Sequence, residues 1–147
     1  MKFYFDMDGT IANLYTVDNW LSRLRAEDAS CYEEAEPMFD FRYFARLLNA
    51  VQRAGHEVGI ISWGSMESSA DFMQATREAK IRWLRKHLPS VFWDEIHIVK
   101  YGAPKHFNCQ DNSGILFDDN YHVRELWENY GEAFEPDEIM EVLKSFL

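Results

Sequence analysis

The chain has 147 residues, of which 47% are hydrophobic and 27% charged, and this composition indicates one folded globular domain, 1–147, rather than a disordered chain. The formal net charge of -10 argues against general binding to nucleic acid or anionic membranes, which depends on clustered Lys and Arg. No window approaches the roughly 20 apolar residues of a membrane span, and a single pair of cysteines, Cys31 and Cys109, indicates free thiols in a cytoplasmic protein.

Short apolar runs without polar alternation predict strands that are buried on both faces. In chain order these runs are KFYF before Asp6, EVGIIS ending at Ser62, EIHIV before Lys100, GILF before Asp118, and a shorter EAF near the C-terminus. Between them apolar residues repeat with helical spacing, so strands and helices alternate along the chain. This alternation predicts an α/β fold, in which a parallel sheet carries helices on both faces.

Four stretches between and after these strands predict helices. FDFRYFARLLNAVQRAG closes at Gly55, HVRELWENYG follows the fourth strand, and PDEIMEVLKSFL opens with Pro136. SSADFMQATREAKIRWLRKHLP places Met73, Ile81, Leu84 and Leu88 on one apolar stripe. The basic run 77–87 within this stretch is interpreted as a solvated helix face.

The segment 13–37 interrupts the alternation directly after the first strand. It contains a short predicted helix, DNWLSRL, with Asp18 as its cap, followed by the acidic stretch RAEDASCYEEAEP. Two interpretations stay open for Trp20, Leu21 and Leu24: packing on the core, which their helical spacing favours, and lining of a substrate pocket. We therefore expect an insertion made of a helix and a loop.

Three of the predicted strands end in polar or acidic residues, namely Asp6, Ser62, and Asp118 with Asp119. In an open parallel sheet the carboxyl ends of the strands meet at one edge, where ligands bind. Residues two apart in an extended segment face the same way, so Asp6 and Asp8 can converge on one point. Two like unit charges 4 Å apart repel by about 4 kcal/mol at an effective dielectric of 20, so such a cluster needs a cation. The carboxylates therefore predict a Mg²⁺ site.

These motifs resemble those of the haloacid dehalogenase (HAD) superfamily of aspartate-dependent phosphotransferases. FYFDMDGT matches that family's first motif, a hydrophobic strand followed by D-x-D-G-T, GIIS matches its second, and ILFDDN matches its fourth. The resemblance extends over the whole chain. It implies a Rossmann-like HAD fold, with a five-stranded parallel sheet in the order 5-4-1-2-3 and a small helical cap formed by 13–37.

The resemblance also implies a role for each matched residue. Asp6 would attack phosphorus to form an aspartyl-phosphate, and Asp8 would protonate the leaving oxygen and then activate water. Asp6 and Asp118 would bind Mg²⁺ through their carboxylates, Asp8 through its backbone carbonyl, and Asp119 would hold a metal-bound water or orient the site. Ser62 would hydrogen-bond the phosphoryl oxygens.

The third motif of the family is a lysine, and two residues are candidates for it. Lys105 in GAPKHF lies 13 residues before Asp118, at the expected start of a short helix. Lys100 lies at the end of the third predicted strand. The position of Lys105 is similar to that of the lysine in deoxyribonucleotidase-like members, which favours Lys105, and Lys100 stays open as the alternative.

The insertion also bears on the substrate, because a small cap implies an open site. Within 13–37 six acids stand against Arg23 and Arg25, the acids being Asp18, Glu27, Asp28, Glu33, Glu34 and Glu36. Such a rim would repel DNA or RNA and favours a small phosphomonoester, without extended nucleic-acid binding. The aromatic Tyr15, Trp20 and Tyr32 could stack on a base, and the spacing of the last two motifs resembles that of the 5'(3')-deoxyribonucleotidase branch. Both observations suggest a nucleotide.

The expected function is thus a Mg²⁺-dependent phosphomonoester hydrolase that acts through an aspartyl-phosphate. Two alternatives remain beside it. One is a phosphate-binding or regulatory module of low turnover, and the other is a 3'-phosphatase acting on the ends of nucleic acids.

Overall fold

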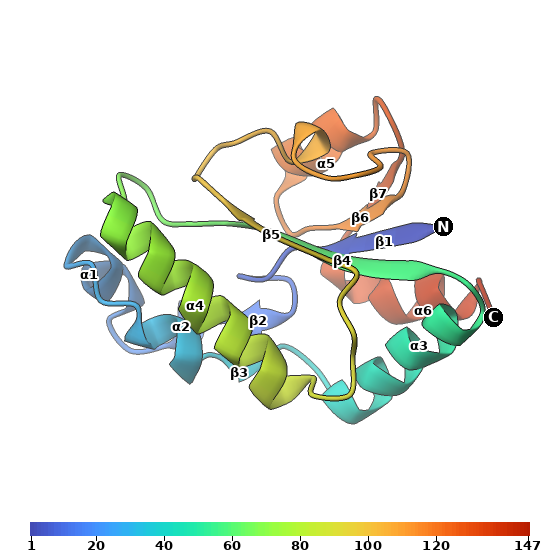
Figure 1. The fold of residues 1–147 in the computed structure, drawn as a ribbon, viewed down its shortest axis with the longest axis horizontal. Coiled ribbons are helices and arrows are strands. Elements are labelled where there is room, and N and C mark those ends of the chain that lie inside the picture. The colour runs from blue at the N-terminus through green and yellow to red at the C-terminus, as the bar shows by residue number, and fades with distance from the viewer.

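The computed structural model describes residues 1–147 and shows a five-stranded parallel sheet at the centre of the molecule (Figure 1). Its strands are β1 (Lys2–Phe5), β4 (Glu57–Trp63), β5 (Glu95–Val99), β6 (Ile115–Phe117) and β7 (Glu132–Phe134). They lie in the order β5-β4-β1-β6-β7, and every neighbouring pair is parallel. The α/β fold with a parallel sheet is therefore confirmed.

The observed strand order differs in its numbering from the expected 5-4-1-2-3. That expectation counted five strands, whereas the chain forms seven, because β2 (Ala12–Asn13) and β3 (Glu36–Pro37) pair with each other in a separate two-stranded sheet. Both precede β4 along the chain and so shift the numbers of all later strands. Across the main sheet, the strand that leads to Asp6 lies between the strand of Ser62 and the strand that leads to Asp118.

Helices cover both faces of the sheet, as expected (Figure 1). One face carries α3 (Phe41–Arg53), α4 (Ala70–His87) and α6 (Ile139–Lys144), and the other carries α5 (Tyr121–Trp127). The period of two along β1 explains this division, because Phe3 and Phe5 lie in the larger core with the first set of helices and Tyr4 lies in the smaller core with α5. Gly55 follows α3 with a positive φ, and Pro136 opens a 3-10 turn (Pro136–Glu138) that leads into α6.

The apolar face of α4 differs in part from the predicted one. Leu84 and Leu88 are buried as predicted, whereas Met73 and Ile81 are only half-buried. The other buried side chains of the helix include Phe72, Thr76, Lys80 and Trp83. The interpretation of the basic run 77–87 as a solvated face was therefore wrong for Lys80, which is 1% exposed. At about 100° per residue, these four positions lie within about 80° of one another, on the side of the helix that faces the sheet and the insertion.

The inserted segment 13–37 begins and ends at the antiparallel pair of β2 and β3, in which Asn13 lies opposite Glu36. Between them lie a 3-10 turn (Leu14–Thr16), α1 (Trp20–Arg25) and α2 (Ser30–Glu34). The expected helix thus begins at Trp20 after Asn19, which adopts a left-handed conformation, and Asp18 does not cap it. The acidic stretch forms a second helix instead of a loop, because its Cys31 and Tyr32 are buried against α4.

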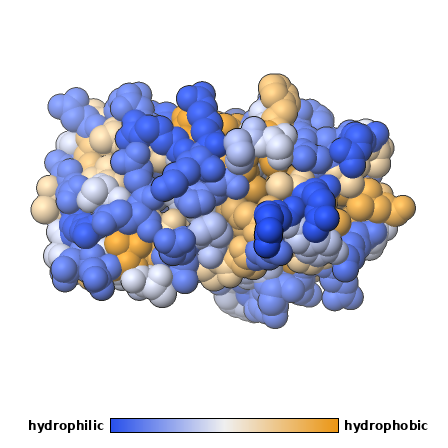
Figure 2. Space-filling view, turned by 90° about the horizontal axis from the view of Figure 1, so that it is seen from below, coloured by the Kyte–Doolittle hydropathy of each residue, from blue (hydrophilic) through white to orange (hydrophobic).

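The surface seen from below the view of Figure 1 is mostly hydrophilic, with separate hydrophobic patches (Figure 2). This is the side of α3 and α4, whose apolar residues face the sheet. Cys31 and Cys109 are both free thiols, as expected. None of the helices combines the length and the apolar character that crossing a membrane requires.

Candidate active site

A cavity of about 690 Å³ lies at the carboxyl ends of the central strands, between the sheet and the inserted segment. This volume is within the range of small-molecule sites. The charged residues predicted for the site that line it are Asp6, Asp8, Lys105, Asp118 and Asp119. The topology therefore brings together carboxylates that are separated by more than a hundred positions in the sequence.

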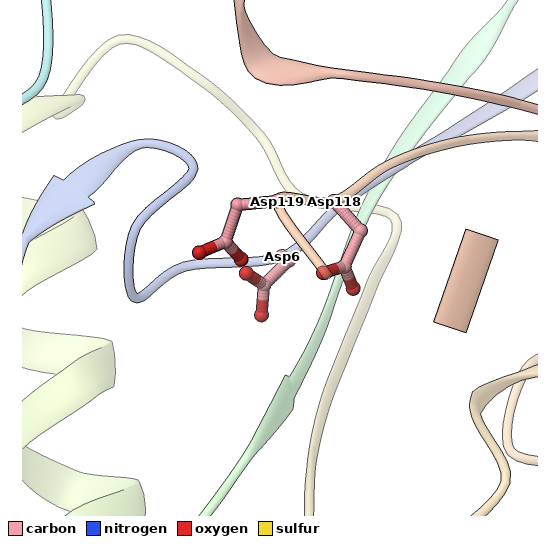
Figure 3. A group of neighbouring side chains, drawn as sticks. All are labelled: Asp6, Asp118 and Asp119. Carbon is pink, nitrogen blue, oxygen red and sulfur yellow. The ribbon is translucent and has the colours of Figure 1, made fainter. Parts of the chain in front are cut away.

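Three of these carboxylates, those of Asp6, Asp118 and Asp119, point toward one another (Figure 3). Their nearest oxygens all lie within 4.8 Å of one another. Asp6 and Asp118 are buried, and Asp119 is at the surface of the cavity. The carboxylate of Asp8 does not belong to this group, so only its backbone carbonyl stays a predicted metal ligand.

Lys105 is buried between two of the clustered carboxylates. Its Nζ donates hydrogen bonds to Oδ1 of Asp6 at 2.9 Å and to Oδ2 of Asp118 at 2.7 Å. Burial alone would lower the pKa of Lys105, but the charges of Asp6 and Asp118 together raise it, so the ammonium stays charged. Lys100 is exposed and makes none of these contacts. The geometry thus favours Lys105 over Lys100 as the lysine of the site.

The single ammonium group does not balance the carboxylates. Burial and the adjacent Asp6 raise the pKa of Asp118 to about 6, and the same two causes raise the pKa of Asp119 to about 8. Charged carboxylates are therefore disfavoured here unless a further cation is close. Three converging carboxylates are hard oxygen donors of the kind that Mg²⁺ prefers, so the residues present fit this ion.

The turn after β1 is tied to the Asp119 loop through Thr10. The hydroxyl of Thr10 donates to Oδ2 of Asp6 at 2.8 Å and accepts from the backbone N–H of Asp119 at 3.1 Å. Thr10 is fully buried. The threonine of the D-x-D-G-T motif therefore holds the carboxylate of Asp6 and the backbone of Asp119, a role that was not predicted.

Gly9 allows this turn to approach Asp119. Its φ is +83°, and an added Cβ would lie 2.9 Å from Cε2 of Tyr15 and would overlap Oδ2 of Asp119. We expect Gly9→Ala to displace the Asp119 carboxylate and to raise the Kd for Mg²⁺ about tenfold, measured by titration calorimetry.

Gly55→Ala is the matched control for Gly9→Ala, because Gly55 also has a positive φ, +96°, but an added Cβ would have nothing within 4 Å. Both variants should lose about 1 kcal/mol of stability from the left-handed backbone. Only Gly9→Ala should bind Mg²⁺ more weakly, and equal Kd values in the two variants would contradict the expectation.

Ser62 lies deeper than expected. It is fully buried within β4, which continues to Trp63, and it is not among the residues that line the cavity. Its Oγ accepts a hydrogen bond of 2.7 Å from Nζ of Lys80, and the same Nζ donates to Oδ2 of Asp8 at 2.9 Å. Lys80 thus connects two predicted site residues, although it is not itself one of the predicted ones.

The inserted segment forms the wall of the cavity that faces the carboxylates. The side chains that it contributes are Leu14, Tyr15, Trp20, Leu21, Leu24, Arg25 and Tyr32. Trp20, Leu21 and Leu24 therefore line a pocket, and Trp20 and Leu24 also pack on the core of the insertion. Trp63 and Tyr101 provide aromatic rings on the side of the sheet.

None of the six acids of the insertion lines the cavity, so the expected acidic rim does not face the site. Glu33 and Glu34 form ion pairs with Arg82 and Arg23, and Glu27 accepts a hydrogen bond from the backbone of Ser69. The inner surface of the insertion is instead mostly apolar, with Arg25 as its one cation.

Neither the protein-family models nor the curated proteins give a match to this chain. Solved structures with the same fold include one described as the Pnkp1/Rnl/Hen1 complex, with 20% identity, a TM-score of 0.58, and coverage of 91% of this chain and 44% of that chain. They also include a D,D-heptose 1,7-bisphosphate phosphatase from Burkholderia thailandensis, with 14% identity, a TM-score of 0.54, and coverage of 89% and 74%. The chain thus spans less than half the length of the first. These likenesses establish a fold shared with a phosphatase.

Proposed function

We propose that this protein is a Mg²⁺-dependent phosphomonoester hydrolase of the HAD superfamily. The observation that carries the proposal is the carboxylate of Asp6, which lies in the cavity next to Asp118 and Asp119 and is held on both oxygens by Lys105 and Thr10. A nucleophile in a phosphoryl-transfer site needs such fixed positioning and nearby positive charge, because these supply most of the catalysis. The shared fold supports the proposal without specifying the reaction.

In the proposed reaction the Asp6 carboxylate attacks phosphorus, the bond to the ester oxygen breaks, and Asp8 gives its proton to the leaving alcohol. Asp8 then takes a proton from a water molecule, whose oxygen attacks the same phosphorus and releases Asp6 and inorganic phosphate. Lys105 stabilises the negative charge next to Asp6 during both steps. Mg²⁺ held by Asp6, Asp118 and Asp119 would supply further positive charge for the phosphoryl oxygens.

The shape and lining of the cavity favour a small substrate. The segment 13–37, which we propose as a small cap, leaves a space of about 690 Å³ and lines its own side of it mostly with aromatic and apolar side chains. Arg25 is the one exposed cation among the lining residues, which supports a small phosphomonoester more than a nucleic acid end. Tyr15, Trp20 and Trp63 could stack on a base, so nucleotides are the first class of substrate to test.

The test is phosphate release from p-nitrophenyl phosphate, sugar phosphates, and 5'- and 3'-nucleotides, each with Mg²⁺ and with EDTA. We expect turnover of at least one ester with Mg²⁺ and none with EDTA, and restored turnover when Mg²⁺ is added back. The ranking of the esters then tests the nucleotide proposal. A protein that binds Mg²⁺ and inorganic phosphate but hydrolyses no ester would overturn the enzyme proposal and favour a phosphate-binding module.

A further inference from the structure

A second buried lysine, Lys80, lies directly behind the cavity. It comes from the middle of α4, which follows the strand of Ser62, and is 1% exposed. Its Nζ donates three hydrogen bonds, to Oδ2 of Asp8 at 2.9 Å, to Oγ of Ser62 at 2.7 Å and to the carbonyl oxygen of Trp63 at 2.8 Å. An ammonium group has three donors, so every donor of Lys80 is used.

This arrangement separates Lys80 from the residues that face a bound ligand. Lys80 does not line the cavity, whereas Asp8 and Lys105 do. The ring of Tyr32, from α2 of the insertion, covers Nζ at 4.8 Å and closes the remaining side. Lys80 therefore has neither a free donor nor open space with which to bind a phosphate group itself.

We infer that Lys80 is a positioning residue for Asp8, which deepens the proposed function and rests on it. By holding Oδ2, Lys80 fixes the rotation of the Asp8 carboxylate and leaves Oδ1, for which the structure shows no hydrogen-bond partner, to exchange a proton with the leaving group. The two lysines thus divide their tasks: Lys105 holds the nucleophile Asp6, and Lys80 holds the acid and base Asp8.

A buried ion pair between α4 and the turn after β1 also has a purely structural interpretation. Removing Lys80 would leave Asp8 and Ser62 without a donor, and that alone would destabilise the protein. The two interpretations differ in what they predict for the leaving group. A structural loss slows every substrate alike, whereas a misplaced Asp8 slows only those reactions that need a proton on the departing oxygen.

Phenyl phosphate and p-nitrophenyl phosphate make this comparison possible, because they have the same ring and differ in how readily the phenolate departs without a proton. In Lys80→Met, kcat/KM for phenyl phosphate should fall about 100-fold, the lower end of what general acid catalysis contributes. For p-nitrophenyl phosphate the fall should be at least tenfold smaller. The ratio kcat/KM is the appropriate quantity, because it reports the first phosphoryl transfer.

Lys86→Met is the matched control, because Lys86 lies on the same helix but is exposed and outside the cavity, and it should leave both rates unchanged. Lys80→Arg keeps the charge and the donors and should restore the ratio of the two rates toward that of the wild type. This variant also provides the test if Lys80→Met does not fold, which thermal unfolding reveals. In an Asp8→Asn background, Lys80→Met should have little further effect on phenyl phosphate, because both changes act on the same proton transfer.

Equal losses on the two esters, or losses that add to that of Asp8→Asn, would overturn the inference while leaving the proposed function intact. A wild type that hydrolyses neither ester nor any other in the panel would overturn the proposed function and the inference with it. A selective loss on phenyl phosphate that disappears in the Asp8→Asn background would establish Lys80 as the residue that positions Asp8.

Discussion

Replacing Asp6 by Asn should abolish phosphate release, with kcat reduced by a factor on the order of 10⁵. The amide nitrogen or oxygen of Asn cannot form the phosphoryl-enzyme bond, and the remaining site offers no other carboxylate held in the same position by both Lys105 and Thr10. The variant should still fold, because removing one negative charge from a group of three neighbouring acids, two of them buried, relieves repulsion. Phosphate release and thermal unfolding of the same preparation measure the two effects.

Asp71→Asn is the matched control for Asp6→Asn, because Asp71 is exposed on the first turn of α4 and makes no contact with the cavity. It should keep the activity of the wild type. Mass spectrometry of the wild type quenched during turnover should also reveal a phosphorylated Asp6. An Asp6→Asn protein that still turned over at a substantial fraction of the wild-type rate would show that another group attacks phosphorus.

The convergence of Asp6, Asp118 and Asp119 could be predicted from the sequence because it follows from topology. Each of these acids comes directly after a strand of a parallel sheet, and parallel strands end at one edge. Lys105 was favoured over Lys100 only by the resemblance of its position, 13 residues before Asp118, to that of the lysine in deoxyribonucleotidase-like proteins. The prediction of the carboxylate cluster needed only the order and type of the elements, and no detail of how helices pack on the sheet.

Lys80 could not be found in this way, because it is 72 positions from Asp8 and lies on a helix. Its contact depends on the rotation of α4 against the sheet, which is set by the packing of Trp83 and Phe72 and leaves Lys80 on the same buried side. The sequence does contain a signal: Phe72, Thr76, Lys80 and Trp83 follow helical spacing, and a lysine on such a stripe is unusual. Because 77–87 was interpreted as a single solvated basic face, the buried position of Lys80 was not predicted.

The inserted segment shows the limit of charge counting. Its six acids were expected to form the rim of the site, but ion pairs and a hydrogen bond such as that of Glu27 direct them elsewhere. Composition gives the number of charges in a segment, whereas their direction depends on which side of each short helix packs against α4. Here the buried Cys31 and Tyr32 decide that direction for α2.

Lys105→Met should strongly destabilise the protein in the absence of divalent cations, and Mg²⁺ should recover much of the loss. Lys105 is 3% exposed and is the one ammonium within hydrogen-bonding distance of both Asp6 and Asp118, so its removal leaves the carboxylate cluster without an internal cation. Removing one partner of a buried ion pair typically costs about 3 to 5 kcal/mol. Thermal or denaturant unfolding with EDTA and with Mg²⁺ measures this loss, and Mg²⁺ should raise the Tm of the variant more than that of the wild type.

Lys100→Met is the matched control for Lys105→Met and at the same time tests the alternative lysine of the sequence analysis. Because Lys100 is exposed and does not contact Asp6 or Asp118, its replacement should leave both the stability and its response to Mg²⁺ unchanged.

At saturating Mg²⁺, Lys105→Met should still lose about 100-fold in kcat, because a diffusible ion cannot take over the fixed hydrogen bond to Oδ1 of Asp6. A loss of activity in Lys100→Met and not in Lys105→Met would reverse the assignment of the two lysines, and equal Mg²⁺ stabilisation of Lys105→Met and wild type would show that Lys105 and the metal do not balance the same carboxylates.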